Sequence, residues 1–220
     1  MSKIRAIIFD LDDTLIHSRI DYVGVKRSLI RFLVDYGVEP HLLNENMPNL
    51  EIFRVAGESL RNKNLPEEFI RRVFEGAKAI LDSYELKALE GVRLMEGALE
   101  TLDALKRMGL KIGIVTNSCR EYTIRVIEMF SLNKYVDAFI TRDDVNNLKP
   151  APEHLLKALE ALGVSAHETV FVGDHWIDAI CAERANVKFI LLRNERWKFK
   201  ETGTVIDDLM SLPAVIQSIS

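Results

Sequence analysis

Five short apolar runs divide the chain, and each is followed at once by a polar residue or glycine. The first contains no alternation of apolar and polar residues, which is typical of a strand buried on both faces of a parallel sheet, and the other four are similar. The runs are Ala6 to Phe9, Lys111 to Val115, Ala138 to Ile140, Thr169 to Val172 and Lys188 to Leu192. We therefore expect a sheet whose strand ends gather polar residues at one edge.

Between the later runs, apolar residues recur at the spacing of a helix. The expected helices are Gly97 to Met108, Glu121 to Phe130, Pro152 to Leu162 and Ile177 to Ala185. Pro152 suits the first turn of its helix, where a missing N–H costs nothing. Strands that alternate with helices predict βαβ units. The expected fold class is α/β, with a Rossmann-like, doubly wound parallel sheet as its core.

The region between the first two runs breaks this rhythm. It contains three long amphipathic patterns, at residues 21–36, 50–62 and 66–89, and no strand-like run. A βαβ unit needs roughly 30 residues, so about 70 residues are inserted here. We expect an α-helical cap domain at residues 16–90, inserted into an α/β catalytic core made of residues 1–15 and 91–220.

Composition and charge narrow the possible partners. The chain has 220 residues, 48% of them hydrophobic, with 33 acidic and 29 basic side chains and a net charge of −4. This balance gives no support for nucleic acid or an anionic membrane as a partner. The first apolar run is too short for a signal peptide, and no stretch approaches the ~20 apolar residues of a membrane span. With two cysteines and no required disulfide, we expect a cytoplasmic protein, a monomer or homodimer.

Polar residues that suit phosphate chemistry follow three of the expected strands. Crowded carboxylates repel one another and need a cation or a proton, and Mg²⁺ prefers oxygen ligands of this kind. A hydroxyl, backbone amides and a lysine suit a phosphate group, and an aspartate can form an aspartyl-phosphate. The residues are Asp10 and Asp12, Thr116 and Asn117, Asp174 and Asp178, with Lys149 on the connection before the last pair.

Four segments, in order along the chain, carry a specific resemblance. They are Asp10-Leu11-Asp12-Asp13-Thr14-Leu15, Thr116-Asn117-Ser118, Lys149-Pro150 with Pro152-Glu153, and Gly173-Asp174-His175-Trp176-Ile177-Asp178. The first resembles a DxDx(T/V) motif and the last a GDxxxD motif. Together they are similar to the four motifs of the haloacid dehalogenase (HAD) superfamily. The insertion after the first motif resembles members with a helical C1-type cap, the phosphoglycolate-phosphatase-like enzymes.

The resemblance implies a catalytic role for three residues. Asp10 is the implied nucleophile, which attacks phosphorus and also binds the metal. Asp12 is the implied general acid and then general base, and its backbone carbonyl is an implied metal ligand. Lys149 is expected to offset the charge of Asp10 and of the phosphoryl group. The resemblance also implies that the dehalogenases of this superfamily lack the second acid of the first motif. The presence of Asp12 at that position therefore favours phosphoryl chemistry.

The remaining implied roles concern binding. Asp174 is an implied direct ligand of Mg²⁺, and Asp178 binds it directly or through water. Thr116 and Asn117 are expected to hold phosphate oxygens, through a hydroxyl and a backbone amide respectively. In the cap, Arg19 is the candidate for a substrate anion because it closely follows the first motif; Arg27, Arg54 and Arg61 are expected to be solvated helix residues.

The resulting prediction is a Mg²⁺-dependent phosphatase that hydrolyses a small phosphorylated metabolite, with phosphoglycolate as the leading candidate. Two alternatives stay open: a phosphomutase, such as one acting on a sugar phosphate, and a phospho-switch like a response-regulator receiver. Cys119 and Arg125 share the C-x5-R spacing of cysteine-dependent phosphatases, but the intervening residues lack glycine and look helical. We expect Cys119 to open a helix and to take no part in catalysis.

Three smaller expectations concern residues beside these motifs. Thr14 either stabilises its loop or contacts phosphate, and the sequence leaves both open. His175 is expected to be a solvated loop histidine. Trp176 and Trp197 are expected to serve in packing or to face the cap.

Overall fold

The structure is a computed structural model that describes residues 3–194 and 203–219. Trp197 lies outside the described residues. The chain divides into two compact units, one made of Met1–Ser18 with Gly91–Ser220 and the other of Arg19–Glu90. None of the helices in the described part of the chain combines the length and the apolar character needed to cross a membrane.

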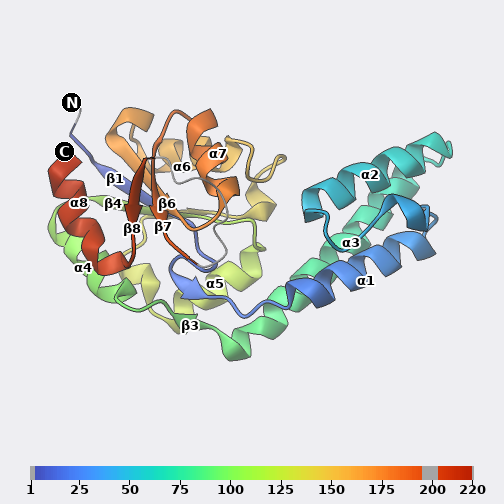
Figure 1. Ribbon diagram of the computed structural model, residues 1–220, viewed down its shortest axis with the longest axis horizontal. Helices are drawn as coiled ribbons and strands as arrows, with labels where there is room; N and C mark the ends of the chain where they lie inside the picture. The colour runs from blue at the N-terminus through green and yellow to red at the C-terminus, as the bar shows by residue number, and fades with distance from the viewer. Residues whose placement is uncertain (1–2, 195–202, 220) are drawn as a thin grey trace. The chain divides into compact units, whose positions relative to one another are not determined.

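The first unit contains a six-stranded parallel sheet, which confirms the expected α/β core (Figure 1). Its strand order is β5-β4-β1-β6-β7-β8, so β1 lies between β4 and β6. The central strands are fully buried, because their uninterrupted apolar residues face helices on both sides. The strands are β1 (Ala6–Phe9), β4 (Lys111–Val115), β5 (Ala138–Ile140), β6 (Thr169–Gly173), β7 (Lys188–Leu192) and β8 (Thr204–Ile206).

Helices cover this sheet on both faces. Ile8 and Phe171 of the sheet share a buried cluster with Leu155 of α6 and Cys181 of α7, so α6 and α7 lie on the same face. In Figure 1, α4 and α8 lie on the other side of the sheet, where they contact each other. The helices are α4 (Ala98–Arg107), α5 (Arg120–Met129), α6 (Glu153–Leu162), α7 (Trp176–Arg184) and α8 (Leu212–Ile219).

A small two-stranded sheet lies where the chain leaves and re-enters the first unit. Strand β2 (Ile16–His17) pairs antiparallel with β3 (Arg93–Leu94). The adjacent Met95 N–H also donates to the Leu15 carbonyl at 2.9 Å. This pairing keeps residues 16–18 with the core, although the sequence pattern shows no strand there.

The second unit is helical and has a core of its own. It comprises α1 (Tyr22–Asp35), α2 (Asn49–Asn62) and α3 (Glu67–Ala88), which confirms the expected helical insertion between the first two long strands. Leu29, Ile52 and Val73, one from each helix, belong to a single buried cluster. Gly76 allows α3 to approach α1, because a Cβ there would lie 2.5 Å from the Phe32 ring.

Short 3₁₀ helices complete the described elements. They are Pro40–Leu42, Leu89–Gly91, Leu132–Lys134, Arg142–Asp144, Ala166–Glu168 and Leu209–Ser211.

Candidate active site

The loop after β1 carries the first two acids. The Asp10 N–H donates to the Val172 carbonyl at 2.9 Å, which extends the pairing of β1 with β6 by one residue. Asp10 is thereby fixed at the carboxyl end of the central strand, and only 6% of it is exposed. The loop then turns back, with Asp13 at φ 61° and its N–H donating to the Ile16 carbonyl.

Lys149 provides a buried positive charge beside Asp10. Its Nζ donates to Asp10 Oδ1 at 2.5 Å and to Asp178 Oδ1 at 2.8 Å, and its side chain is only 4% exposed. Burial alone lowers the pKa of Lys149, but the carboxylates of Asp10 and Asp178 outweigh burial and raise it. Lys149 is therefore a permanent cation at neutral pH, held between two acids.

Asp10, Asp174 and Asp178 form an acidic cluster in which one oxygen of each lies within 4.8 Å of the others. Burial raises the pKa of Asp10 well above its ordinary value; Lys149 opposes this, and the carboxylates of Asp178 and Asp174 add to it. Burial and the Asp178 carboxylate likewise raise the pKa of Asp174 to about 7. Three buried carboxylates with one ammonium leave an excess of negative charge, which a hard divalent cation with oxygen ligands would offset.

Two neighbouring side chains orient Asp174. Thr14 Oγ1 donates to Asp174 Oδ1 at 3.3 Å, and Asn194 Nδ2 donates to Asp174 Oδ2 at 2.5 Å and to the Asp174 carbonyl at 3.2 Å. Thr14 was expected either to stabilise its loop or to contact phosphate. The structure shows it bonded to Asp174, so its hydroxyl links the loop after β1 to the end of β6. Asn194 follows β7, and the sequence reasoning did not select it.

The start of α7 positions Asp178. The His175 N–H donates to Asp178 Oδ2 at 3.2 Å, and His175 Nδ1 accepts from the Ile177 N–H at 3.3 Å, so His175 caps the helix. His175 is exposed, as expected of a loop histidine. Gly173 is required just before this turn, because a Cβ there would lie 2.7 Å from the Asp178 side chain.

Thr116 and Asn117 follow β4 and lie beside the acids. Thr116 Oγ1 donates to Asp12 Oδ2 at 3.2 Å. The Asn117 side chain donates to the Lys149 carbonyl at 3.2 Å and accepts from the Lys149 N–H at 3.0 Å. The Asn117 amide group therefore fixes the backbone of the catalytic lysine candidate, a contact that the sequence did not predict.

All seven core residues selected from sequence contact another member of that set or share the acidic cluster with one, although Asn117 contacts only the backbone of Lys149. Sequence reasoning placed Ser118 in the second motif without a role of its own and did not select Tyr122; the hydroxyls of both donate to Asp12. Arg19 belongs to the helical unit, where it is exposed and adopts φ 56°. Its role toward a substrate stays a prediction.

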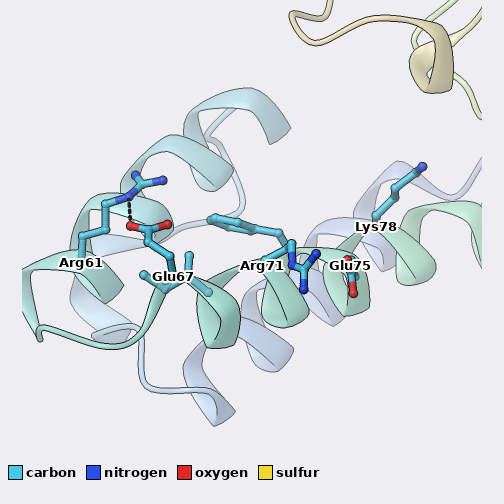
Figure 2. Close-up of a pocket in the computed structure, with 7 residues that line it drawn as sticks. Arg61, Glu67, Arg71, Glu75 and Lys78 are labelled. Carbon is cyan, nitrogen blue, oxygen red and sulfur yellow. Dashed lines mark hydrogen bonds and ion pairs between the residues drawn. The ribbon is translucent and has the colours of Figure 1, made fainter.

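The arginines that we expected to be solvated helix residues of the cap are paired on its surface. Arg27 contacts Glu45, Arg54 contacts Glu51 and Glu58, and Arg61 contacts Glu67. Figure 2 shows Arg61 at one end of an open groove of about 380 Å³, with Arg71, Glu75 and Lys78 spaced along α3. Phe74 and Ile70 form its apolar part. The charges of opposite sign along this groove do not define a site for an anion.

The fold and the acidic cluster together define a class of protein: α/β proteins with a helical insertion and carboxylates at the ends of parallel strands. The chain belongs to the haloacid dehalogenase-like hydrolase family, whose profile matches residues 7–192. It is a HAD-family phosphatase, which confirms the resemblance read from the four motifs. This membership removes the receiver-like alternative.

Individual relatives agree with this assignment. The chain is 30% identical over 192 residues to the pyrophosphatase PpaX of Bacillus cereus strain B4264, covering 84% of this chain and 82% of that protein. It is 41% identical over 93 residues to the pyrophosphatase PpaX of Halalkalibacterium halodurans, covering 42% of this chain and 43% of that protein. The fold resembles the crystal structure of a predicted phosphoglycolate phosphatase from Haemophilus somnus 129pt, with a TM-score of 0.67, 20% identity and coverage of 98% and 99% of the two chains.

Proposed function

We propose that the chain hydrolyses a small phosphomonoester through an aspartyl-phosphate on Asp10, with Mg²⁺ as the cofactor. The observation that supports this best is the position of Asp10, at 2.5 Å from the Lys149 ammonium and within the acidic cluster of Asp174 and Asp178. A carboxylate nucleophile, a buried cation and oxygen ligands for a divalent ion are the parts that phosphoryl transfer requires.

In the first proposed step, a carboxylate oxygen of Asp10 attacks phosphorus. The bond between phosphorus and the leaving-group oxygen breaks, and its electron pair stays on that oxygen. Asp12 transfers its proton to the same oxygen, so that a neutral alcohol leaves. The Lys149 ammonium, 2.5 Å from Asp10, stabilises the negative charge on the phosphoryl group as Asp10 bonds to it.

In the second step, Asp12 is ionised and takes a proton from a water molecule. The water oxygen attacks phosphorus, the bond between phosphorus and Asp10 breaks, and inorganic phosphate is released. Asp10 regains its carboxylate and Asp12 its proton, so both residues return to their starting states.

The same geometry supports an assignment of the metal and phosphate ligands. The side chains of Asp10, Asp174 and Asp178 would hold Mg²⁺, which explains why three carboxylates lie together in this cluster. The Asp12 carbonyl is a further proposed ligand. A bound Mg²⁺ supplies positive charge to the phosphoryl oxygens. We assign Thr116 and the Asn117 backbone amide to the phosphate oxygens, since both follow β4 next to Asp12.

The substrate class is a small phosphorylated metabolite. Phosphoglycolate remains the leading phosphomonoester, with Arg19 as the proposed contact to its carboxylate. Pyrophosphate is a second candidate, because the PpaX relatives that match this chain are named pyrophosphatases. A sugar-phosphate mutase remains the alternative reaction on the same aspartate.

Phosphate release from a panel of compounds tests the proposal. The panel holds phosphoglycolate, pyrophosphate, sugar phosphates and p-nitrophenyl phosphate, each assayed with Mg²⁺ and with EDTA. We expect Mg²⁺-dependent release that falls at least about a thousandfold in Asp10→Asn. Asp103→Asn makes the same change in the ion pair with Arg107 on α4 and should leave release unchanged.

Three outcomes would contradict parts of the proposal. Release that persists in Asp10→Asn would exclude Asp10 as nucleophile. Release that is unaffected by EDTA would exclude the metal. Interconversion of sugar phosphates that requires a bisphosphate activator, without free phosphate, would favour the mutase.

A further inference from the structure

Asp12 is surrounded by hydroxyl groups from one short segment. Its Oδ2 accepts from Ser118 Oγ at 2.6 Å and from Thr116 Oγ1 at 3.2 Å, and its Oδ1 accepts from the Tyr122 hydroxyl at 3.0 Å. Both oxygens of the carboxyl group are therefore held by donors. Because two separate oxygens are held, the group is restrained in rotation as well as in position.

The Tyr122 contact comes from a rigid part of the core. Tyr122 is 0% exposed and lies in the first turn of α5, which begins at Arg120. Its ring is among the largest fully buried side chains of the chain. A phenol so enclosed cannot swing to another partner, so its hydroxyl marks a fixed point for Asp12 Oδ1.

Hydroxyl groups suit the work that the proposed function gives to Asp12. In each turnover Asp12 loses a proton to the leaving group and later takes one from water. A hydroxyl can donate or accept, so it can remain bonded to Asp12 in both states, whereas an ammonium would favour only the ionised one. Proton transfer also needs the carboxyl group within hydrogen-bond reach of the leaving oxygen, which makes its orientation part of the rate.

We propose that Tyr122, with Ser118, is a positioning residue that aims Asp12 at the leaving-group oxygen. The inference rests on the proposed function, since it gives Tyr122 a role only if Asp12 protonates the leaving group. It also predicts where Tyr122 matters most. A poor leaving group, such as an alkoxide, needs the proton of Asp12, whereas p-nitrophenolate leaves without it.

The test compares kcat/KM on two substrates, because this constant reports the steps up to departure of the leaving group. The substrates are p-nitrophenyl phosphate and the best alkyl phosphate of the panel. Tyr122→Phe removes only the hydroxyl and keeps the buried ring. We expect kcat/KM for the alkyl phosphate to fall roughly 10- to 100-fold, while the value for p-nitrophenyl phosphate stays nearly unchanged.

Two further variants complete the experiment. Tyr135→Phe is the matched control, because Tyr135 lies just before β5, at the sheet edge opposite the strand ends that carry the site. It should leave both substrates unchanged. Ser118→Ala removes the 2.6 Å hydrogen bond to Asp12, should show the same selective loss, and serves if Tyr122→Phe does not fold.

The outcomes separate this inference from the proposed function. An active wild type whose Tyr122→Phe and Ser118→Ala variants lose the same factor on both substrates, or lose nothing, would overturn the positioning role alone. A wild type that hydrolyses no phosphate ester would contradict the proposed function, and the positioning role with it. A loss confined to the alkyl phosphate would support both.

Discussion

Replacement of Lys149 by methionine should show how much one buried cation stabilises the site. Lys149 Nζ lies 2.5 Å from Asp10 and 2.8 Å from Asp178, with 4% of the side chain exposed. Methionine keeps the apolar stem and removes the charge. Loss of one partner from a buried ion pair typically costs about 3–5 kcal/mol. At roughly 2–4 °C per kcal/mol for a chain of this size, the melting temperature should fall by roughly 6–20 °C at pH 8 in EDTA.

The loss should depend on pH in a definite direction. Lys149 has a folded-state pKa above its unfolded value, so its stabilisation is fully present throughout the range from pH 5 to pH 8. Asp10 has a raised folded-state pKa, so the folded state binds an additional proton and its stability falls as pH rises. Lys149 holds the pKa of Asp10 down, so in its absence that pKa is higher still and stability continues to fall to a higher pH. The variant should therefore be closest to the wild type near pH 5 and furthest from it near pH 8.

Thermal unfolding at a series of pH values, in EDTA, measures this directly. The control is Lys106→Met, which removes the lysine of a partly exposed pair with Asp137 at 2.8 Å. An exposed pair contributes about 0–1 kcal/mol, so this control should change the melting temperature little. Equal losses in the two variants, or a larger loss for Lys149→Met at pH 5 than at pH 8, would refute the reasoning.

Three further predictions concern the metal and the cysteine. Because the pKa of Asp174 is raised to about 7, its contribution to stability falls as pH rises from about 4 to 7 without metal, so Mg²⁺ should raise the melting temperature more at pH 8 than at pH 5; equal increments would contradict this. Asn194→Ala should weaken Mg²⁺ binding by about 10- to 100-fold in calorimetric titration, and unchanged affinity would exclude an orienting role. The control is Asn133→Ala, at an exposed position of the 3₁₀ helix Leu132–Lys134. Cys119→Ser should keep phosphatase activity, since Cys119 is buried at the start of α5, whereas loss of turnover in a folded variant would revive the C-x5-R alternative.

The sequence predicted the strands and helices whose burial shows as a run or a regular spacing of apolar residues. Strands β1, β4, β5 and β7 have the bounds expected from their apolar runs. Of these, β1 is buried along its whole length, β4 and β7 along most of theirs, and the edge strand β5 is half-buried. Strand β8 was missed because only two apolar residues, Val205 and Ile206, mark it in the sequence. Strand β2 was also missed, because its two residues pair with β3 far along the chain.

The candidate site was also predictable only in part. Residues at strand ends were found because the topology of a parallel sheet brings those ends together. Two of the partners that orient them, Asn194 and Tyr122, were not found. Tyr122 lies within the helix expected at Glu121 to Phe130, and its ring is buried like the apolar positions of that helix. Its hydroxyl, however, meets Asp12 from 110 residues away, and periodicity carries no information about that contact.

The most direct test of the central claim is to trap the phosphorylated aspartate. Enzyme that is turning over its best substrate with Mg²⁺ is quenched in acid and treated with borohydride, which reduces an acyl phosphate to an alcohol, and the peptides are then analysed by mass spectrometry. We predict that Asp10 is converted to homoserine in the wild type when substrate is present, and that no such conversion occurs without substrate or in Asp10→Asn. Conversion of a different acid, or rapid turnover with no reducible intermediate at Asp10, would contradict the account.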